Sequence, residues 1–360
     1  MKHALIILIG FMFLHPTHAQ PIDVVIRNFD KSVDSLNGLH EFNGNILLAK
    51  DGKRLYRKSI GFTDSTMEHR LKQNSAFNLA SVSKGFTSAL IMMMKDDGRL
   101  SFDDAVVRFI PEFPYPSLTI RHLLNHTHGM IEYFDWIVDT LNVKETVDNQ
   151  RLISLLATHK PELKWALGER FEYCNTGYAV LASVLERVSG LPYRELLRKR
   201  ILEPVRMRNT FVYTVDQTRS PSNRVFGIRF FDNQWHPSDL TTLDGIVGDG
   251  NIYSTVGDLL KWDQALRRSD GLIRKETLDQ AYTPARVKEN PRMAYGFGWI
   301  IDDGGRKVSH SGSWNGFKNN FVRDLRYGYT MIFLSNGTSG PPFWQTMQKL
   351  EKAIATHHRE

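Results

Sequence analysis

The chain has 360 residues, of which 41% are hydrophobic and 24% are charged, and its formal net charge is +7. A chain of this length and composition buries enough apolar surface to fold as a soluble globular protein without disulfides or a structural metal. The single cysteine, Cys174, excludes an internal disulfide, and the basic residues are spread along the chain, which favours a solvated surface over a nucleic-acid partner.

The first residues have the layout of a secretory signal peptide. Lys2 gives a positive start, residues 4–14 form an apolar run too short to span a bilayer, and Thr-His-Ala at 17–19 offers a small-residue cleavage site. We therefore expect a signal peptide over 1–19 and a mature chain over 20–360. The expected location is periplasmic or secreted, with no stable membrane insertion after cleavage. The alternative is an uncleaved membrane anchor.

The chain then opens with a helix and a hairpin. Residues 22–39 carry apolar side chains at helical spacing, which predicts a helix. Two strands are predicted over 43–49 and 54–61, on either side of the turn signal Asp51-Gly52.

The middle of the chain is mainly helical and its end returns to strands. Proline and glycine interrupt the helical pattern between residues 81 and 200, and strong helices are expected to include 86–94 and 178–188. The expected C-terminal elements are strands at 295–301, 307–310, 319–323 and 329–334 and a helix at 342–357. This order predicts an α/β (α+β) fold, with an antiparallel sheet flanked by helices and a mainly helical lobe inserted roughly within 85–240. An active site is expected in the cleft between lobes.

The tetrapeptide Ser-Val-Ser-Lys at 81–84 is the first candidate for chemistry. It follows an expected strand end at 77–80 and opens the helix that includes 86–94. Residues i and i+3 share a helix face, so the amine of Lys84 can reach the hydroxyl of Ser81. A serine hydroxyl needs an adjacent base, and the positive end of a helix favours the developing alkoxide. The alternative is that Ser81 only caps the helix and Lys84 is solvated.

The tripeptide Tyr-Cys-Asn at 173–175 is the second candidate and lies in a loop before the helix 178–188. A tyrosine beside a cation can act as a general acid or base, and an asparagine two residues on can hold a substrate amide. The alternative is a buried Tyr173 with Asn175 as a helix cap. For Cys174 we expect a packed side chain rather than a redox-sensitive thiol.

The tetrapeptide His-Ser-Gly-Ser at 310–313 is the third candidate, placed after an expected strand and before a turn. Gly312 lets the backbone approach a ligand closely. The amide N–H after it can bind an oxyanion together with the N–H of Ser81. The alternative is a β-turn with a hydrogen-bonded histidine.

In this order the three motifs resemble those of the serine β-lactamase and penicillin-binding protein superfamily. The Tyr-x-Asn form resembles its class C β-lactamase branch, which has DD-carboxypeptidase, D-aminopeptidase and esterase relatives. The resemblance implies a β-lactamase/transpeptidase-like fold over nearly the whole mature chain. It is carried by the segments 77–84, 97–104, 119–129, 173–190 and 248–259.

The resemblance also implies roles for the site residues. Ser81 would be acylated, Lys84 and Tyr173 would manage its proton, and Asn175 would hold a substrate amide. The oxyanion would sit on the N–H groups of Ser81 and Ser313.

The third motif departs from the family pattern. His310, Ser311 and Gly312 stand where the family has Lys-Thr-Gly, so a titratable imidazole replaces the cation that usually faces a substrate carboxylate. We therefore expect weaker recognition of β-lactams and D-Ala-D-Ala peptides, and a KM that changes between about pH 5.5 and 8.

Together these features predict a serine hydrolase that acts through an acyl-enzyme on a small molecule or peptide: an amide, D-amino-acid derivative, ester or β-lactam. No metal or organic cofactor is expected. His122, His126 and His128 lack a nearby acidic ligand set and are expected to make structural hydrogen bonds. A second hypothesis is a non-catalytic ligand-binding or assembly module on the same fold.

Overall fold

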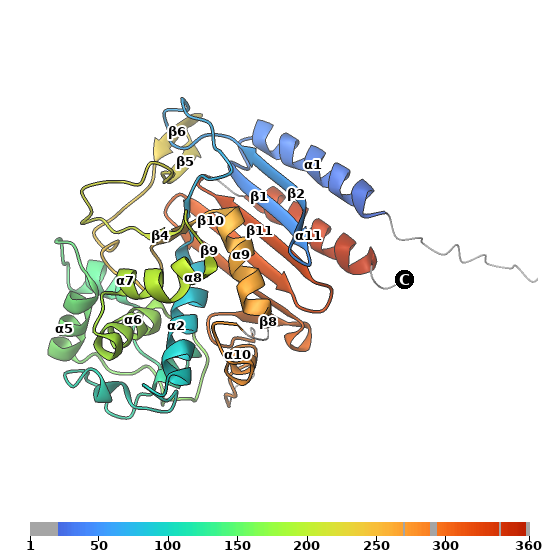
Figure 1. Cartoon of the computed structure of the whole chain (residues 1–360). Helices are drawn as coiled ribbons and strands as arrows, with labels where there is room; N and C mark the ends of the chain where they lie inside the picture. Colours follow the sequence, from blue (N-terminus) through green and yellow to red (C-terminus); the bar gives the residue numbers. More distant parts are fainter. Residues whose placement is uncertain (1–20, 269–270, 289–293, 338–339, 358–360) are drawn as a thin grey trace, which may run out of the picture.

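The computed structural model describes residues 21–268, 271–288, 294–337 and 340–357 (Figure 1). The signal peptide predicted over 1–19 lies outside these residues. Among the residues described, no helix combines the length and the apolar character needed to cross a membrane.

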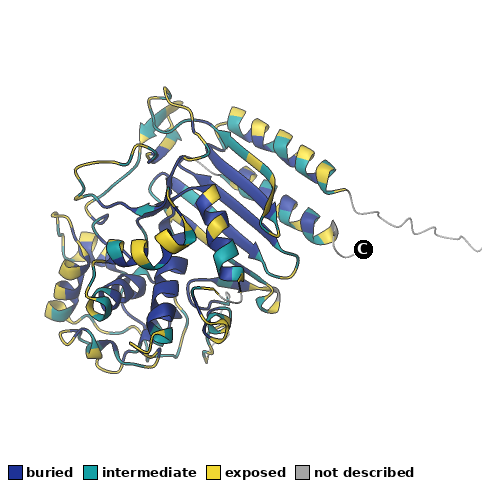
Figure 2. Cartoon of the chain, viewed as in Figure 1, coloured by how far each residue is buried: buried dark blue, intermediate teal, exposed yellow. Residues whose placement is uncertain are grey.

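A six-stranded antiparallel sheet forms the centre of the molecule, with the strand order β2-β1-β11-β10-β9-β8. Its strands are β1 (Gly44–Lys50), β2 (Lys53–Ile60), β8 (Ile300–Asp302), β9 (Lys307–Trp314), β10 (Phe317–Asp324) and β11 (Tyr329–Ser335). Strand β1 pairs with β11, so segments from both ends of the chain lie side by side in the sheet. Every residue of β11 is buried, because helices cover both faces of the sheet (Figure 2).

Two helices from the two ends of the chain cover one face of this sheet. Helix α1 (Ile22–Gly38) buries Val25, Phe29 and Val33 at helical spacing, and α11 (Pro341–His357) packs beside it (Figure 1). Helix α9 (Val256–Arg267) packs against β1 and β11 on the other face.

The helical part of the chain lies beside the sheet. It contains α2 (Lys84–Asp96), α3 (Ile120–Leu124), α4 (Tyr133–Asp135), α5 (Asn149–His159), α6 (Asn175–Ser189), α7 (Tyr193–Leu197) and α8 (Glu203–Val205). A three-stranded sheet has the order β3 (Phe77–Asn78), β7 (Ile252–Ser254), β4 (Phe211–Val212). A two-stranded sheet pairs β5 (Ile228–Phe231) with β6 (Gln234–Pro237). A further helix is α10 (Lys275–Ala281). This mixed antiparallel α/β architecture confirms the predicted fold class. The limits of the inserted lobe, 85–240, stay a prediction.

Two strand predictions differ from the structure. The strand expected over 295–301 is confined to β8, and Tyr295 makes a single bridge to Ile300. The strand expected over 307–310 continues to Trp314, because its ladder with β10 is unbroken through the Ser-Gly-Ser sequence. The third motif therefore lies inside a strand and not in a turn.

A buried ion pair fastens α9 to the sheet. The guanidinium of Arg323, on β10, donates to Asp263 Oδ1 at 2.8 Å, and both side chains are at most 1% exposed. Arg267 and Thr330 donate to the same carboxylate. Burial alone would raise the pKa of Asp263, but the two arginines outweigh it and the pKa lies below its ordinary value.

Removal of this carboxylate leaves Arg323 buried without its counter-charge. We expect Asp263→Ala to lower the free energy of unfolding by about 3–5 kcal/mol in urea titrations, because an unpaired charge in the interior is strongly destabilising. As a control, Asp279→Ala removes a carboxylate from an exposed ion pair with Lys275 and should leave the unfolding midpoint unchanged. Equal unfolding midpoints for both variants would contradict a stabilising role for the buried carboxylate of Asp263.

Candidate active site

Ser81 lies in a short helical turn, η1 (Ala80–Ser83), between β3 and α2. The turn is sharp: Ala80 has a φ of +47°, in the left-handed region that costs a non-glycine residue about 1–2 kcal/mol. Its amide donates to Asn78 Oδ1 at 2.9 Å, which holds the backbone in this conformation. The turn places Ser81, which is only partly buried, at the edge of a cavity.

Lys84 is fully buried beneath Ser81. Its Nζ lies 3.2 Å from Ser81 Oγ, 2.7 Å from Asn175 Oδ1 and 3.0 Å from the backbone oxygen of Asp249. The last two oxygens can only accept, so they take two hydrogens of the amine. A neutral amine then turns its lone pair toward the Ser81 hydroxyl, and an ammonium turns its third hydrogen there. The arrangement can thus take a proton from Ser81 and return it.

Tyr173 and Asn175 reach the same place from the start of α6. Asn175 is the first residue of that helix and bonds directly to Lys84. The ring of Tyr173 lies 5.1 Å from Lys84 Nζ, which is a cation–π distance. Its hydroxyl is buried and has no hydrogen-bond partner within the described structure. A buried hydroxyl without a partner costs free energy, which any atom that came within hydrogen-bond distance would recover.

Strand β9 passes directly behind the nucleophile. A Cβ on Gly312 would lie 2.2 Å from the backbone oxygen of Leu79 and 3.2 Å from the amide nitrogen of Ser81, so only glycine fits there. Ser313, the next residue, lines the same cavity as Ser81. The two backbone N–H groups expected to bind the oxyanion, those of Ser81 and Ser313, therefore belong to two segments that are in contact.

His310 differs from the titratable, substrate-facing imidazole that the sequence predicts. It is 2% exposed, and burial together with Lys84 lowers its pKa to about 3. Its Nδ1 lies 2.6 Å from the carbonyl oxygen of Ser311, which only accepts, so Nδ1 carries the hydrogen. Nε2 must then accept from the hydroxyl of Tyr295, at 2.8 Å. His310 is thus a neutral side chain that packs on the inner face of β9, whereas Ser311 is exposed.

The other histidines and the cysteine have structural surroundings. His122 caps α3 with Thr119, and the Nδ1 atoms of His126 and His128 bond to backbone groups. Among the residues that the structure describes, no group of histidine, cysteine and acidic side chains could hold a metal. Cys174 is 2% exposed and burial raises the pKa of its thiol to about 12, as expected of a packed side chain.

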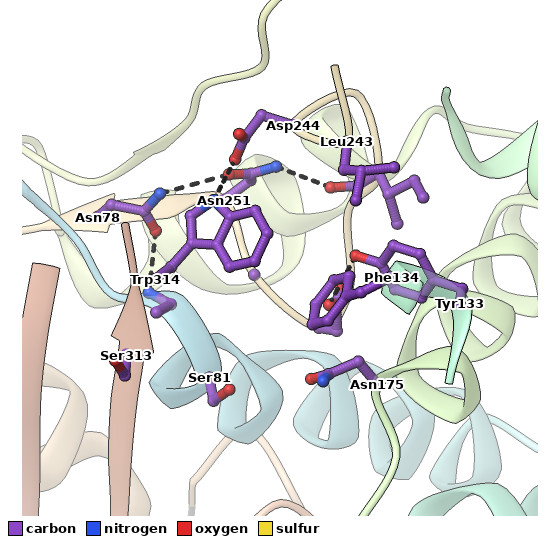
Figure 3. A pocket seen from close by; sticks show the side chains of 14 residues that line it. Asn78, Ser81, Tyr133, Phe134, Asn175, Leu243, Asp244, Asn251, Ser313 and Trp314 are labelled. Atoms are coloured by element: carbon purple, nitrogen blue, oxygen red, sulfur yellow. Dashed lines mark hydrogen bonds between the residues drawn. The ribbon is translucent and has the colours of Figure 1, made fainter. Parts of the chain in front are cut away.

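The cavity beside Ser81 has a volume of about 50 Å³. Figure 3 shows the side chains that line it. Ser81 and Asn175 lie on one side, and Asp244 and Leu243 lie on the other. The lining residues are Asn78, Ala80, Ser81, Tyr133, Phe134, Asn175, Leu243, Asp244, Ile246, Asp249, Gly250, Asn251, Ser313 and Trp314. No lysine or arginine is among them.

Sequence reasoning missed the two acidic residues of this cavity. Asp244 accepts from Trp314 Nε1 at 2.7 Å, and burial raises its pKa to about 6. Asp249 accepts from the hydroxyl of Tyr133 at 3.1 Å, and burial raises its pKa too, against the opposing effect of Lys84. The segment Gly-Asp-Gly-Asn at 248–251 was a recognisable signal, but no sequence pattern joins Asp244 to Trp314.

Several known proteins are similar to this chain. A family model described as Beta-lactamase matches residues 29–356. Penicillin-binding protein 4* of Bacillus subtilis is 34% identical over 336 residues, which are 89% of this chain and 74% of that protein. A D-aminopeptidase of Cereibacter sphaeroides is 28% identical over 84% of this chain, and the match spans only 59% of that protein. Esterase EstB of Burkholderia gladioli is 25% identical, over 82% of this chain and 87% of that protein.

Solved structures share the fold. A penicillin-binding protein from Bacillus halodurans superposes with a TM-score of 0.76 at 24% identity, covering 92% of this chain and 99% of that chain. A D-amino acid amidase from Ochrobactrum anthropi has a TM-score of 0.78 at 20% identity, covering 92% and 99%. Since the family model covers most of the sequence, the chain belongs to the beta-lactamase family of serine hydrolases.

Proposed function

We propose that this protein is an exported hydrolase that cleaves an amide or ester through an acyl-enzyme on Ser81. The observation that carries the proposal is the position of Lys84, whose amine is held by two acceptors and directed at the Ser81 hydroxyl. A serine hydroxyl next to such a base is an activated nucleophile.

The reaction proceeds in two steps. Lys84 takes the hydroxyl proton as Ser81 Oγ bonds to the substrate carbonyl carbon, and the N–H groups of Ser81 and Ser313 stabilise the oxyanion. The C–N or C–O bond then breaks, and Tyr173 supplies a proton to the leaving amine or alcohol. In the second step water attacks the ester on Ser81 and gives a proton to the Tyr173 oxygen, while the ammonium of Lys84 returns its proton to Ser81 Oγ as the acid is released.

The nucleophile can be tested by covalent labelling. We expect a fluorophosphonate probe to modify Ser81 in the folded protein, and Ser81→Ala to abolish labelling and lower ester hydrolysis by at least about 10⁴-fold. Ser83→Ala, two residues along and buried, is the matched control and should keep labelling. Failure to label the wild-type protein would instead favour a non-catalytic ligand-binding or assembly module on this fold.

The composition of the cavity bears on the substrate. Its apolar wall comes from Phe134, Trp314 and neighbouring aliphatic residues, and its ionisable groups include the carboxyls of Asp244 and Asp249. His310 is neutral and buried, so it adds no positive charge to the site. Above about pH 6 a substrate carboxylate would face the like charge of Asp244 here. We therefore propose apolar substrates that are neutral or cationic, in preference to penicillins or peptides with a C-terminal carboxylate.

Three p-nitrophenyl esters of similar size test this charge preference. They are the 4-(trimethylammonio)butyrate, its uncharged tert-butyl analogue and the glutarate monoester. We expect kcat/KM to fall in that order at pH 7.5, by about tenfold per step, where each tenfold is about 1.4 kcal/mol.

The preference should depend on pH through Asp244, whose raised pKa of about 6 makes it anionic above that pH and neutral below it. The ratio of kcat/KM for the cationic ester to kcat/KM for the neutral ester should therefore rise between pH 5 and pH 7.5. In Asp244→Asn this ratio should not change with pH. The permanent charge of the trimethylammonium group keeps substrate titration out of the profile. Equal rates for the three esters, with Ser81 still labelled, would contradict the charge preference alone.

Export is proposed from the N-terminal sequence. After expression in a bacterial host, we expect the mature protein to begin at Gln20, as the mass of its N-terminal peptide would show. Replacing residues in the apolar core, as in Leu8→Arg with Ile9→Arg, should retain the full-length chain in the cytoplasm. A mature protein that keeps Met1 would contradict cleavage.

A further inference from the structure

Glu132 lies behind the catalytic groups and was not among the residues predicted from the sequence. It stands just before α4, and one of its oxygens, Oε2, receives two hydrogen bonds from Asn175. The backbone N–H of Asn175 donates at 2.8 Å and its side-chain Nδ2 donates at 3.0 Å. The carboxylate thus binds both the first amide of α6 and the side chain that reaches Lys84.

The two bonds fix which way the Asn175 amide points. With Nδ2 turned to the carboxylate of Glu132, Oδ1 must face the opposite side, where it accepts from Lys84 Nζ at 2.7 Å. A flipped amide would set an NH₂ group against the amine of Lys84 and an oxygen against the carboxylate. The second contact would be repulsive and the first would leave a Lys84 hydrogen without its acceptor, so Glu132 selects the observed orientation.

The orientation matters because it sets the direction of the Lys84 amine. Two of the tetrahedral positions on Nζ are taken by Asn175 Oδ1 and the backbone oxygen of Asp249. The remaining direction points at Ser81 Oγ, 3.2 Å away. Without the Asn175 acceptor the amine could turn about its Cδ–Cε and Cε–Nζ bonds, and the contact with Ser81 would be populated for less of the time.

We propose that Glu132 is a positioning residue for acylation, which acts through the amide of Asn175 to hold the amine of Lys84 on Ser81. The proposal rests on the proposed function, because it assigns Glu132 to the same Ser81 acyl-enzyme. It differs from a simple capping role, in which Glu132 would stabilise α6 without changing the rate of acylation.

The geometry offers a way to separate these roles. Both bonds from Asn175 converge on the single oxygen Oε2, so a glutamine at this position can accept both through its amide oxygen. We expect Glu132→Gln to keep the rate constant of Ser81 acylation within about fivefold of wild type. Glu132→Ala removes both bonds and should lower that rate constant about 10–100-fold, because the amide of Asn175 is then no longer held toward Lys84. Stopped-flow measurements with a p-nitrophenyl ester should show this loss in the acylation rate, with apparent substrate affinity changed less than about threefold.

Double variants test the path through Asn175. If Glu132 acts through that amide, Asn175→Ala and Glu132→Ala should be non-additive, and the double variant should acylate no more slowly than Asn175→Ala alone. Additive losses would overturn the proposal, as would an Ala variant that acylates at the wild-type rate.

A polarity swap keeps the test decisive if Glu132→Ala does not fold. Asn175→Asp retains an acceptor for Lys84 but sets a carboxylate against that of Glu132, so acylation should slow. Adding Glu132→Gln supplies an NH₂ donor to the new carboxylate and should recover the rate at least about fivefold. No recovery in a folded double variant would contradict the proposal. Wild-type protein that is never labelled at Ser81 would instead contradict the proposed function.

Discussion

The site depends on the burial of one lysine. Lys84 is inaccessible to solvent, and its amine is surrounded by three oxygens from Ser81, Asn175 and Asp249. Burial of an amine is costly unless its polar atoms are hydrogen-bonded, so the fold must bring these oxygens together from segments far apart in the chain. The turn before α2, the start of α6 and the loop before β7 meet at this point.

The third motif, His310-Ser311-Gly312, differs from the Lys-Thr-Gly pattern at its first two residues. A histidine takes the usual place of a lysine, and burial keeps it neutral, with Tyr295 and the Ser311 carbonyl as its partners. Within the part of the chain described here, Lys84 is then the basic side chain that contacts the nucleophile. The carboxyls of Asp244 and Asp249 consequently have more influence on the charge of the cavity than they would beside a second lysine.

The features that could be predicted from the sequence are those set by residues close together in the chain. The fold class, the hairpin of β1 and β2 and the pairing of Ser81 with Lys84 follow from periodicity, turn signals and the i, i+3 relation. Burial of His310 did not follow, because its aromatic neighbours come from elsewhere in the chain. Glu132 and Asp244 were missed for the same reason: each meets its partner across at least forty residues.

The pairing of β1 with β11 has a consequence for how the chain reaches its folded state. Gly44 lies opposite Ser335, so almost the whole chain separates two neighbouring strands. The central sheet cannot close until β11 has been made, because β11 is the direct neighbour of β1. Such distant strand pairing slows folding and keeps apolar edges exposed meanwhile. The topology therefore makes closure of the central sheet a late step of folding.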